Sequence, residues 1–142
     1  MTRNRVKILA DTRSLLDISF GLLTFVALVY VVSIRFSRST SAQEYLYWID
    51  YFVVRALLSG LMVYSGIKSY GSNPSGLFGL NMGIGLASVF VGIMNVLERT
   101  IARGDWKDVV AAVLYLPIGL IILWITLYIR ARNRKVKDSL AS

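Results

Sequence analysis

The sequence contains no cysteine and no histidine, and only two prolines occur in its 142 residues. This composition excludes disulfides, thiolate nucleophiles, the usual zinc and iron–sulfur sites, and haem held by two histidines. A Ser-His-Asp triad is excluded as well. No close pair of carboxylates suggests hydrolysis or a dimetal centre, and no glycine-rich loop ends in Gly-Lys-Ser or Gly-Lys-Thr. We therefore expect no catalytic residue, cofactor or metal, and no independent enzyme, although a place within a multi-subunit membrane enzyme stays open.

Long uncharged runs dominate the rest of the chain. Hydrophobic residues make up 56% of it and the mean hydropathy is +0.60, which is too apolar for an ordinary soluble domain. About 20 helical residues cross the ~30 Å apolar part of a bilayer. Runs of about this length or longer lie at 15–34, 46–70, 77–97 and 109–129. The sequence predicts an all-α integral membrane protein, a bundle of four transmembrane helices forming a single transmembrane domain over 1–142.

The distribution of positive charge predicts the orientation of these spans. Of the 16 Lys and Arg, ten lie on the side of the two basic tails, 1–14 and 130–142, five lie on the other side, and Arg55 lies within a span. Because Lys and Arg are enriched in cytoplasmic segments, we expect a multi-pass protein of the cell membrane with both termini cytoplasmic. The charges lie beside apolar segments, so we expect anionic lipids as partners and no nucleic acid.

The third span has a face of small and polar residues at helical spacing. These are Asn81, Gly85, Ser88, Gly92 and Asn95. A neighbouring ridge of small residues consists of Gly79, Gly83 and Ala87. Small residues let another backbone approach closely, and asparagine side chains form hydrogen bonds between helices. We interpret the face and the ridge as a packing stripe, with the wall of a pore or substrate path as the alternative.

Charged residues inside apolar runs are the other candidates for a site. Arg55 lies seven residues beyond Trp48, which places it about 10 Å deeper along the helix. Its best predicted partner is Glu98, at the end of the antiparallel third span, although the side chain can also reach back to the interface. Asp17 follows Arg13 by one turn, so we expect an ion pair between these two. A functional role for these charges is the alternative.

The fourth span carries a proline and a glycine that favour a kink. Pro117 removes a backbone donor, so the carbonyl of Val113 loses its usual helical partner, and Gly119 lowers the local stiffness. We expect a kink that is static in the bundle. The alternative is a hinge or a pore-lining bend.

Many packing features and little reactive chemistry favour a structural role. We expect a non-catalytic accessory or structural subunit of a larger membrane protein complex, with other membrane subunits as partners and self-association possible. The alternative is a small channel or transporter that acts as a homo-oligomer. In that case Arg55, Glu98, Asn81 and Asn95 would line the path.

Overall fold

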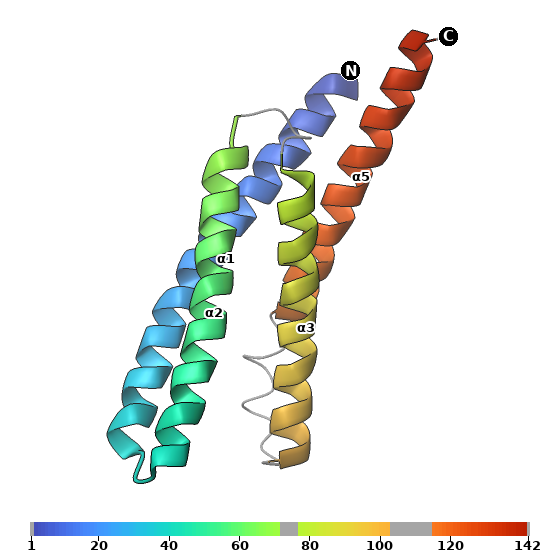
Figure 1. Cartoon of the computed structure of the whole chain (residues 1–142). Helices are drawn as coiled ribbons and strands as arrows, with labels where there is room; N and C mark the ends of the chain where they lie inside the picture. Colours follow the sequence, from blue (N-terminus) through green and yellow to red (C-terminus); the bar gives the residue numbers. More distant parts are fainter. Residues whose placement is uncertain (1, 72–76, 103–114, 142) are drawn as a thin grey trace.

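The computed structural model describes residues 2–71, 77–102 and 115–141, and the side chains of 5–71, 77–97 and 115–135. Within these ranges the chain forms four α-helices (Figure 1): α1 (Thr2–Arg38), α2 (Ala42–Ser69), α3 (Phe78–Ala102) and α5 (Tyr115–Ala141). Each of them is long and apolar enough to cross a membrane. The expected all-helical architecture with four candidate spans is therefore confirmed for the described residues. Residues 109–114 of the fourth predicted span lie outside them.

A short turn connects α1 to α2 and is fixed by side-chain capping. The Ser41 hydroxyl accepts a hydrogen bond from the Glu44 N–H at 3.2 Å, and the Glu44 carboxylate accepts one from the Thr40 N–H at 3.0 Å. This arrangement resembles the capping box and also satisfies two backbone donors at the helix start, but Glu44 accepts from the residue before the N-cap Ser41. The Tyr45 hydroxyl also donates to the Ser39 carbonyl at 2.9 Å. These bonds end one helix and start the next within a few residues.

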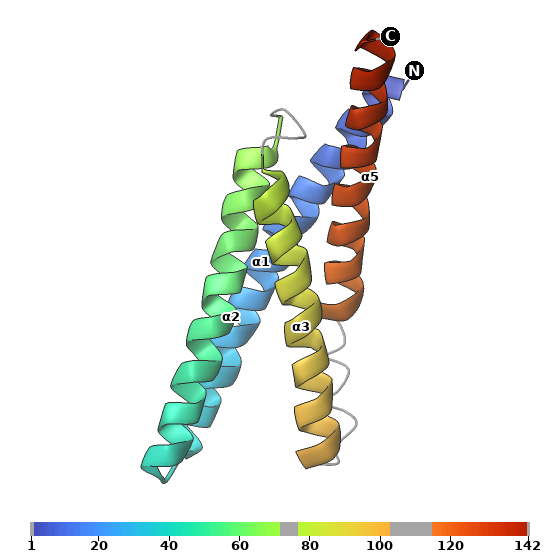
Figure 2. The same cartoon turned by 45° about the vertical axis from the view of Figure 1, so that its right-hand side comes forward.

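The helices associate as two antiparallel pairs. α1 packs mainly against α2, and α3 packs mainly against α5, with smaller contacts of α1 with α5 and of α2 with α3. Both views show α2 and α3 closest at the end of the bundle that carries the start of α1 and the end of α5, and diverging toward the α1–α2 turn (Figures 1 and 2). The beginning and the end of the chain therefore lie at the same end of the bundle.

Glycines explain why these pairs approach so closely. A Cβ atom on Gly66 of α2 would lie 2.6 Å from the carbonyl oxygen of Ser14 in α1. A Cβ on Gly119 of α5 would lie 2.9 Å from the carbonyl oxygen of Gly85 in α3. Contacts this short with backbone atoms can form only where no side chain intervenes. Each pair is thus held at a distance that larger residues would prevent.

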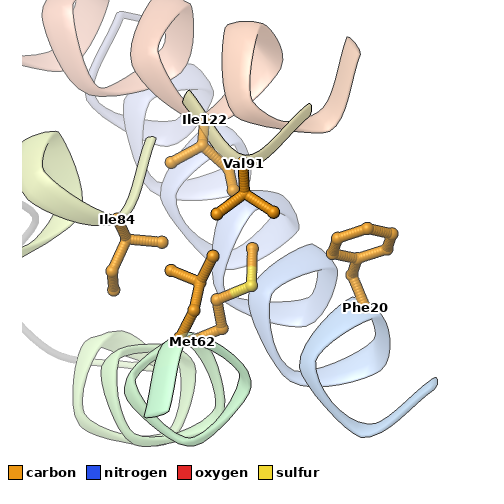
Figure 3. Packing of buried hydrophobic residues seen from close by; sticks show 6 residues of the cluster. Phe20, Met62, Ile84, Val91 and Ile122 are labelled. Carbon is orange, nitrogen blue, oxygen red and sulfur yellow. The ribbon is translucent and has the colours of Figure 1, made fainter. Parts of the chain in front are cut away.

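All four helices contribute to one apolar core cluster, and their side chains converge in its centre (Figure 3). We call it the central cluster, and its buried members are Phe20, Leu58, Met62, Ile84, Val91 and Ile122. A second apolar cluster, the end cluster, joins the first turns of α1 to α5. Its buried members are Ala10, Ile125 and Ile129, against which Val6 and Leu9 pack.

The described parts of the two basic tails, 2–14 and 130–141, are helical and continue the spans. α1 has 37 residues, which corresponds to a length of about 55 Å and exceeds the ~30 Å apolar part of a bilayer. α5 runs on beyond residue 130 to Ala141. Hydropathy locates the apolar part of a helix but not its ends. For this reason the sequence alone predicts the basic tails as segments separate from the spans. The end cluster packs the start of α1 against α5.

The outer surface of the bundle differs from that of a water-soluble one. Large apolar residues point outward on every helix, for example Leu23 (64% exposed), Leu57 (63%) and Phe90 (63%). The interior, in contrast, holds polar and charged side chains such as Asp17 and Asn81, both 0% exposed. A lipid environment accepts the outward apolar surface, whereas water would not. The structure is consistent with a multi-pass membrane protein.

Candidate functional site

A layer of buried polar side chains lies between the central cluster and the end cluster. On α1 it falls between Ala10 and Phe20, and on α5 it reaches the end cluster, because Thr126 lies between Ile125 and Ile129. The close contact between Gly66 and Ser14 brings α2 to the same level. We call this set the polar layer, and its members, all at most 5% exposed, are Arg13, Ser14, Asp17, Ser65, Ser69, Asn81 and Thr126. Every described helix contributes at least one of them.

Hydrogen bonds hold four neutral members of the polar layer, namely Ser14, Ser65, Asn81 and Thr126. The Ser65 hydroxyl of α2 donates to the Asn81 side-chain oxygen of α3 at 2.6 Å, which links the two helix pairs. The Asn81 amide in turn donates to the Leu77 carbonyl at 2.9 Å. Ser14 and Thr126 each donate to a carbonyl one turn back in their own helix, at 2.9 and 2.6 Å. These groups therefore meet the requirement that buried polar atoms find partners.

The two charged members of the polar layer are held differently. Arg13 and Asp17 attract each other electrostatically. Yet the Arg13 Nε and both carboxylate oxygens of Asp17 are buried without a hydrogen-bond partner in the described part of the chain. The two residues lie one turn apart in the interior of the bundle, and the expected ion pair between them stays a prediction. Charges in a poorly polar interior interact strongly, and unsatisfied polar atoms there are costly.

Arg55 forms a second polar centre nearer the α1–α2 turn. Its guanidinium donates to the Asn95 side-chain oxygen of α3 and to the Tyr51 carbonyl at 3.4 Å. It also lies over the Tyr51 ring, 3.4 Å from the ring centroid, in a cation–π contact. The Glu98 side chain lies outside the described residues, so its pairing with Arg55 stays a prediction. Helical spacing in the sequence placed Asn95 on the packing stripe, but it did not identify Asn95 as the hydrogen-bond acceptor of Arg55.

A third polar contact joins α1 to α2 between these two centres. The Thr24 and Ser59 hydroxyls lie 2.9 Å apart in a hydrogen bond. The close approach of Gly21 to the Ser59 carbonyl, where a Cβ would lie at 2.8 Å, makes this contact possible. Little in the sequence indicated this contact, because the hydroxyl groups of serine and threonine in membrane helices often form hydrogen bonds only with the backbone of their own helix. Polar contacts thus occur at three levels along the bundle.

The structure divides the predicted packing stripe of α3 into two parts. Its five residues at helical spacing are all buried: Asn81, Gly85, Ser88, Gly92 and Asn95. A Cβ on Gly85 or Gly92 would lie within 2.7 Å of a leucine side chain of α5. Gly79 and Gly83, in contrast, are exposed, and a Cβ on either would meet nothing within 4 Å. Among the described residues nothing packs on these two glycines, whereas Ala87, the third residue of the ridge, packs against the central cluster.

The predicted kink residues lie at the described start of α5. Pro117 is exposed, and Gly119 is buried against Gly85 and Val89 of α3. Gly119 therefore has a packing role that the sequence pattern did not indicate. The kink itself depends on the carbonyl of Val113, which lies outside the described residues, so it stays a prediction.

The chemistry that the polar layer can support is limited to a few kinds. Within the described ranges, no group of three acidic side chains gathers as a metal site would require. One carboxylate beside one guanidinium suits the binding of water or protons, because the positive charge of Arg13 opposes a divalent cation beside Asp17. No protein-family model, no curated protein and no solved structure matches this chain.

Proposed function

We propose that this chain is a non-catalytic accessory or structural subunit of a larger membrane protein complex, inserted in the cell membrane with both termini in the cytoplasm. Internal hydrogen bonds between helices support this role. Ser65 with Asn81, Thr24 with Ser59 and Arg55 with Asn95 hold the bundle together. A bundle held from within leaves its entire outer surface for lipid and for other membrane proteins.

The observation that carries the proposal is the open ridge on α3. Gly79 and Gly83 lie one turn apart, are exposed, and leave room for a neighbouring backbone. Leu86 and Phe90 continue the outward apolar surface of the same helix, 57% and 63% exposed. Small residues separated by four positions are a common contact surface between membrane helices. The partner is a helix of another membrane subunit, or of a second copy of this chain.

The proposed orientation is supported by the charges at one end of the bundle. Arg5 and Lys7 near the start of α1 are exposed. The cations near the end of α5 are largely exposed as well, namely Arg130, Arg132, Arg134 and Lys135. Such a concentration of positive charge fits the cytoplasmic face and its anionic lipids.

A second candidate is a small channel or transporter that acts as a homo-oligomer. It is favoured by the succession of polar contacts from the polar layer through Thr24 and Ser59 to Arg55 and Asn95. Ionisable groups inside membrane proteins often mark a path for ions or substrates. Under this hypothesis those groups would line a path instead of holding the helices together.

Gentle detergent extraction, a native gel and mass spectrometry of the comigrating proteins test the proposal. We expect the chain to migrate in a stoichiometric complex with other membrane subunits. Gly83→Leu should remove at least about nine tenths of the bound partner, because a leucine side chain blocks close helix approach. Gly60→Leu is the matched control, since Gly60 of α2 is also exposed with nothing within 4 Å. Migration as a single chain, or equal effects of both variants, would count against the proposed role.

Liposome flux separates the two candidates. If the chain transports, Asn95→Leu should abolish flux while the protein still assembles, because the Arg55 partner is lost from the path. If the contact is structural, the same substitution should weaken assembly, and Arg55→Leu should do so equally. Both substitutions remove the hydrogen bond between Arg55 and Asn95. Intact assembly without flux supports transport, whereas weakened assembly supports the structural role.

A further inference from the structure

Arg13 and Asp17 leave three hydrogen-bonding positions open in the interior of the protein. Both side chains are at most 1% exposed. The Arg13 Nε–H can only donate, and the Asp17 carboxyl group accepts through its oxygens. No described residue supplies a partner to any of these three atoms. The molecule that completes them must accept from arginine and donate to a carboxylate.

We propose that water bridges Arg13 and Asp17, and that this water exchanges with the aqueous phase at the end of the bundle where the chain begins and ends. Water both donates and accepts, and buried waters in proteins typically bond to about three otherwise unsatisfied groups. A water between the two charges accepts from Arg13 and donates to Asp17. The polar layer is then a hydrated site within a membrane bundle, a role that goes beyond subunit assembly.

The position of the polar layer explains how solvent reaches it. The end cluster covers it on the side of α1 and α5. On the side of α2, the layer extends to Ser69, the last residue of the helix, which is 5% exposed. The turn begins next to it, and there the Gly71 N–H donates to the Asp11 carboxylate of α1 at 3.3 Å. Polar groups thus continue from Asp17 to the end of the bundle.

A silver-ion assay tests the hydration of the polar layer in the purified full chain, in nanodiscs of phosphatidylcholine. The natural sequence has no cysteine, so Ser14→Cys introduces the single thiol of the chain. The cysteine side chain differs from that of serine only in having sulfur in place of oxygen. Ag⁺ is a small hydrated cation that reacts with a thiol. A sulfur–silver bond forms, and the thiol proton is released into the buffer. Unfolding in detergent followed by maleimide labelling then gives, by mass, the fraction of thiol that silver has protected.

Ile84→Cys is the matched control, because Ile84 lies in the central cluster and is 2% exposed, while Ser14 is 0% exposed. Exposure alone therefore predicts equal rates at the two positions. We expect the thiol at position 14 to react at least about tenfold faster than the thiol at position 84. Water must solvate both the arriving Ag⁺ and the thiolate that reacts with it. Replacing the charges in the same background, with Arg13→Met and Asp17→Leu, should abolish the difference.

Equal rates at both positions would overturn the inference, and so would a fast reaction that survives removal of both charges. Thr126→Cys provides an independent position in the same layer should Ser14→Cys not fold. The assay uses the isolated chain, so its outcome does not depend on any partner subunit. A failure here leaves the proposed assembly role untouched, and a failure of that role leaves this result intact.

Discussion

Asp17→Leu lowers the free energy of unfolding by about 3–5 kcal/mol, because it leaves Arg13 as a buried charge without a counter-charge. Arg13→Met has an effect of similar size for the same reason. The double variant, which contains both changes, recovers most of this loss, since an apolar pair of similar volume replaces two charges. Equilibrium unfolding in mixed micelles of mild detergent and dodecyl sulfate measures all three free energies.

Lys7→Met is the control for the Asp17 experiment. Lys7 lies on the same helix and is exposed, so its replacement should change the free energy of unfolding by less than about 0.5 kcal/mol. The decisive quantity is the coupling between the two charges, obtained from the single and double variants. Additive losses, with the double variant the least stable, would mean that the charges do not depend on each other.

Gly119→Ala is expected to lower the free energy of unfolding by about 1–3 kcal/mol, as overpacking of a tight interior contact does. Its new Cβ would lie 2.9 Å from the Gly85 carbonyl oxygen and 2.9 Å from the Val89 nitrogen. Both are backbone atoms, so relief requires that α3 and α5 move apart. The same unfolding assay measures the change, and a spin-label distance between α3 and α5 reports the movement.

Gly83→Ala provides the comparison for Gly119→Ala. Gly83 lies on α3, and a Cβ atom at this position would meet nothing within 4 Å. The substitution should therefore not lower the free energy of unfolding of the isolated chain, because the new Cβ meets no atom and alanine is the better helix former. An equal loss in both variants would show that helix flexibility, and not the close contact, determines the effect. No loss in either would contradict the tight α3–α5 packing.

The sequence was sufficient for the all-helical architecture and the four candidate spans of the described residues. The apolar runs at 15–34, 46–70 and 77–97 lie along α1, α2 and α3, and an apolar run of this length is typical of a membrane span. The ends of the helices were less predictable. Several residues before position 15 and after position 129 are charged. Charged residues outside the apolar region do not prevent the helix from continuing.

The polar interior was predictable only in part. Helical spacing placed Asn81 and Asn95 on one face, and the structure buries both. Spacing within one helix does not tell which residue of another helix lies opposite, so the Ser65 partner of Asn81 and the Asn95 partner of Arg55 were not identified. The lack of a hydrogen-bond partner for the Asp17 oxygens among the described residues was not predicted either, because residues one turn apart in a helix can pair but need not.

Spin labelling along α3 tests most directly the central claim, that the bundle turns its apolar surface to lipid and its polar groups inward. Single cysteines can be placed in a chain that has none. Labels at Leu86, Phe90 and Leu97 should collide often with oxygen dissolved in lipid, and those at Asn81 and Ser88 rarely. A water-soluble nickel reagent should reach none of the three positions within the apolar part of the helix, Leu86, Ser88 and Phe90. Frequent collisions of that reagent with the outward labels at Leu86 and Phe90 would contradict the account, because those positions would then face water.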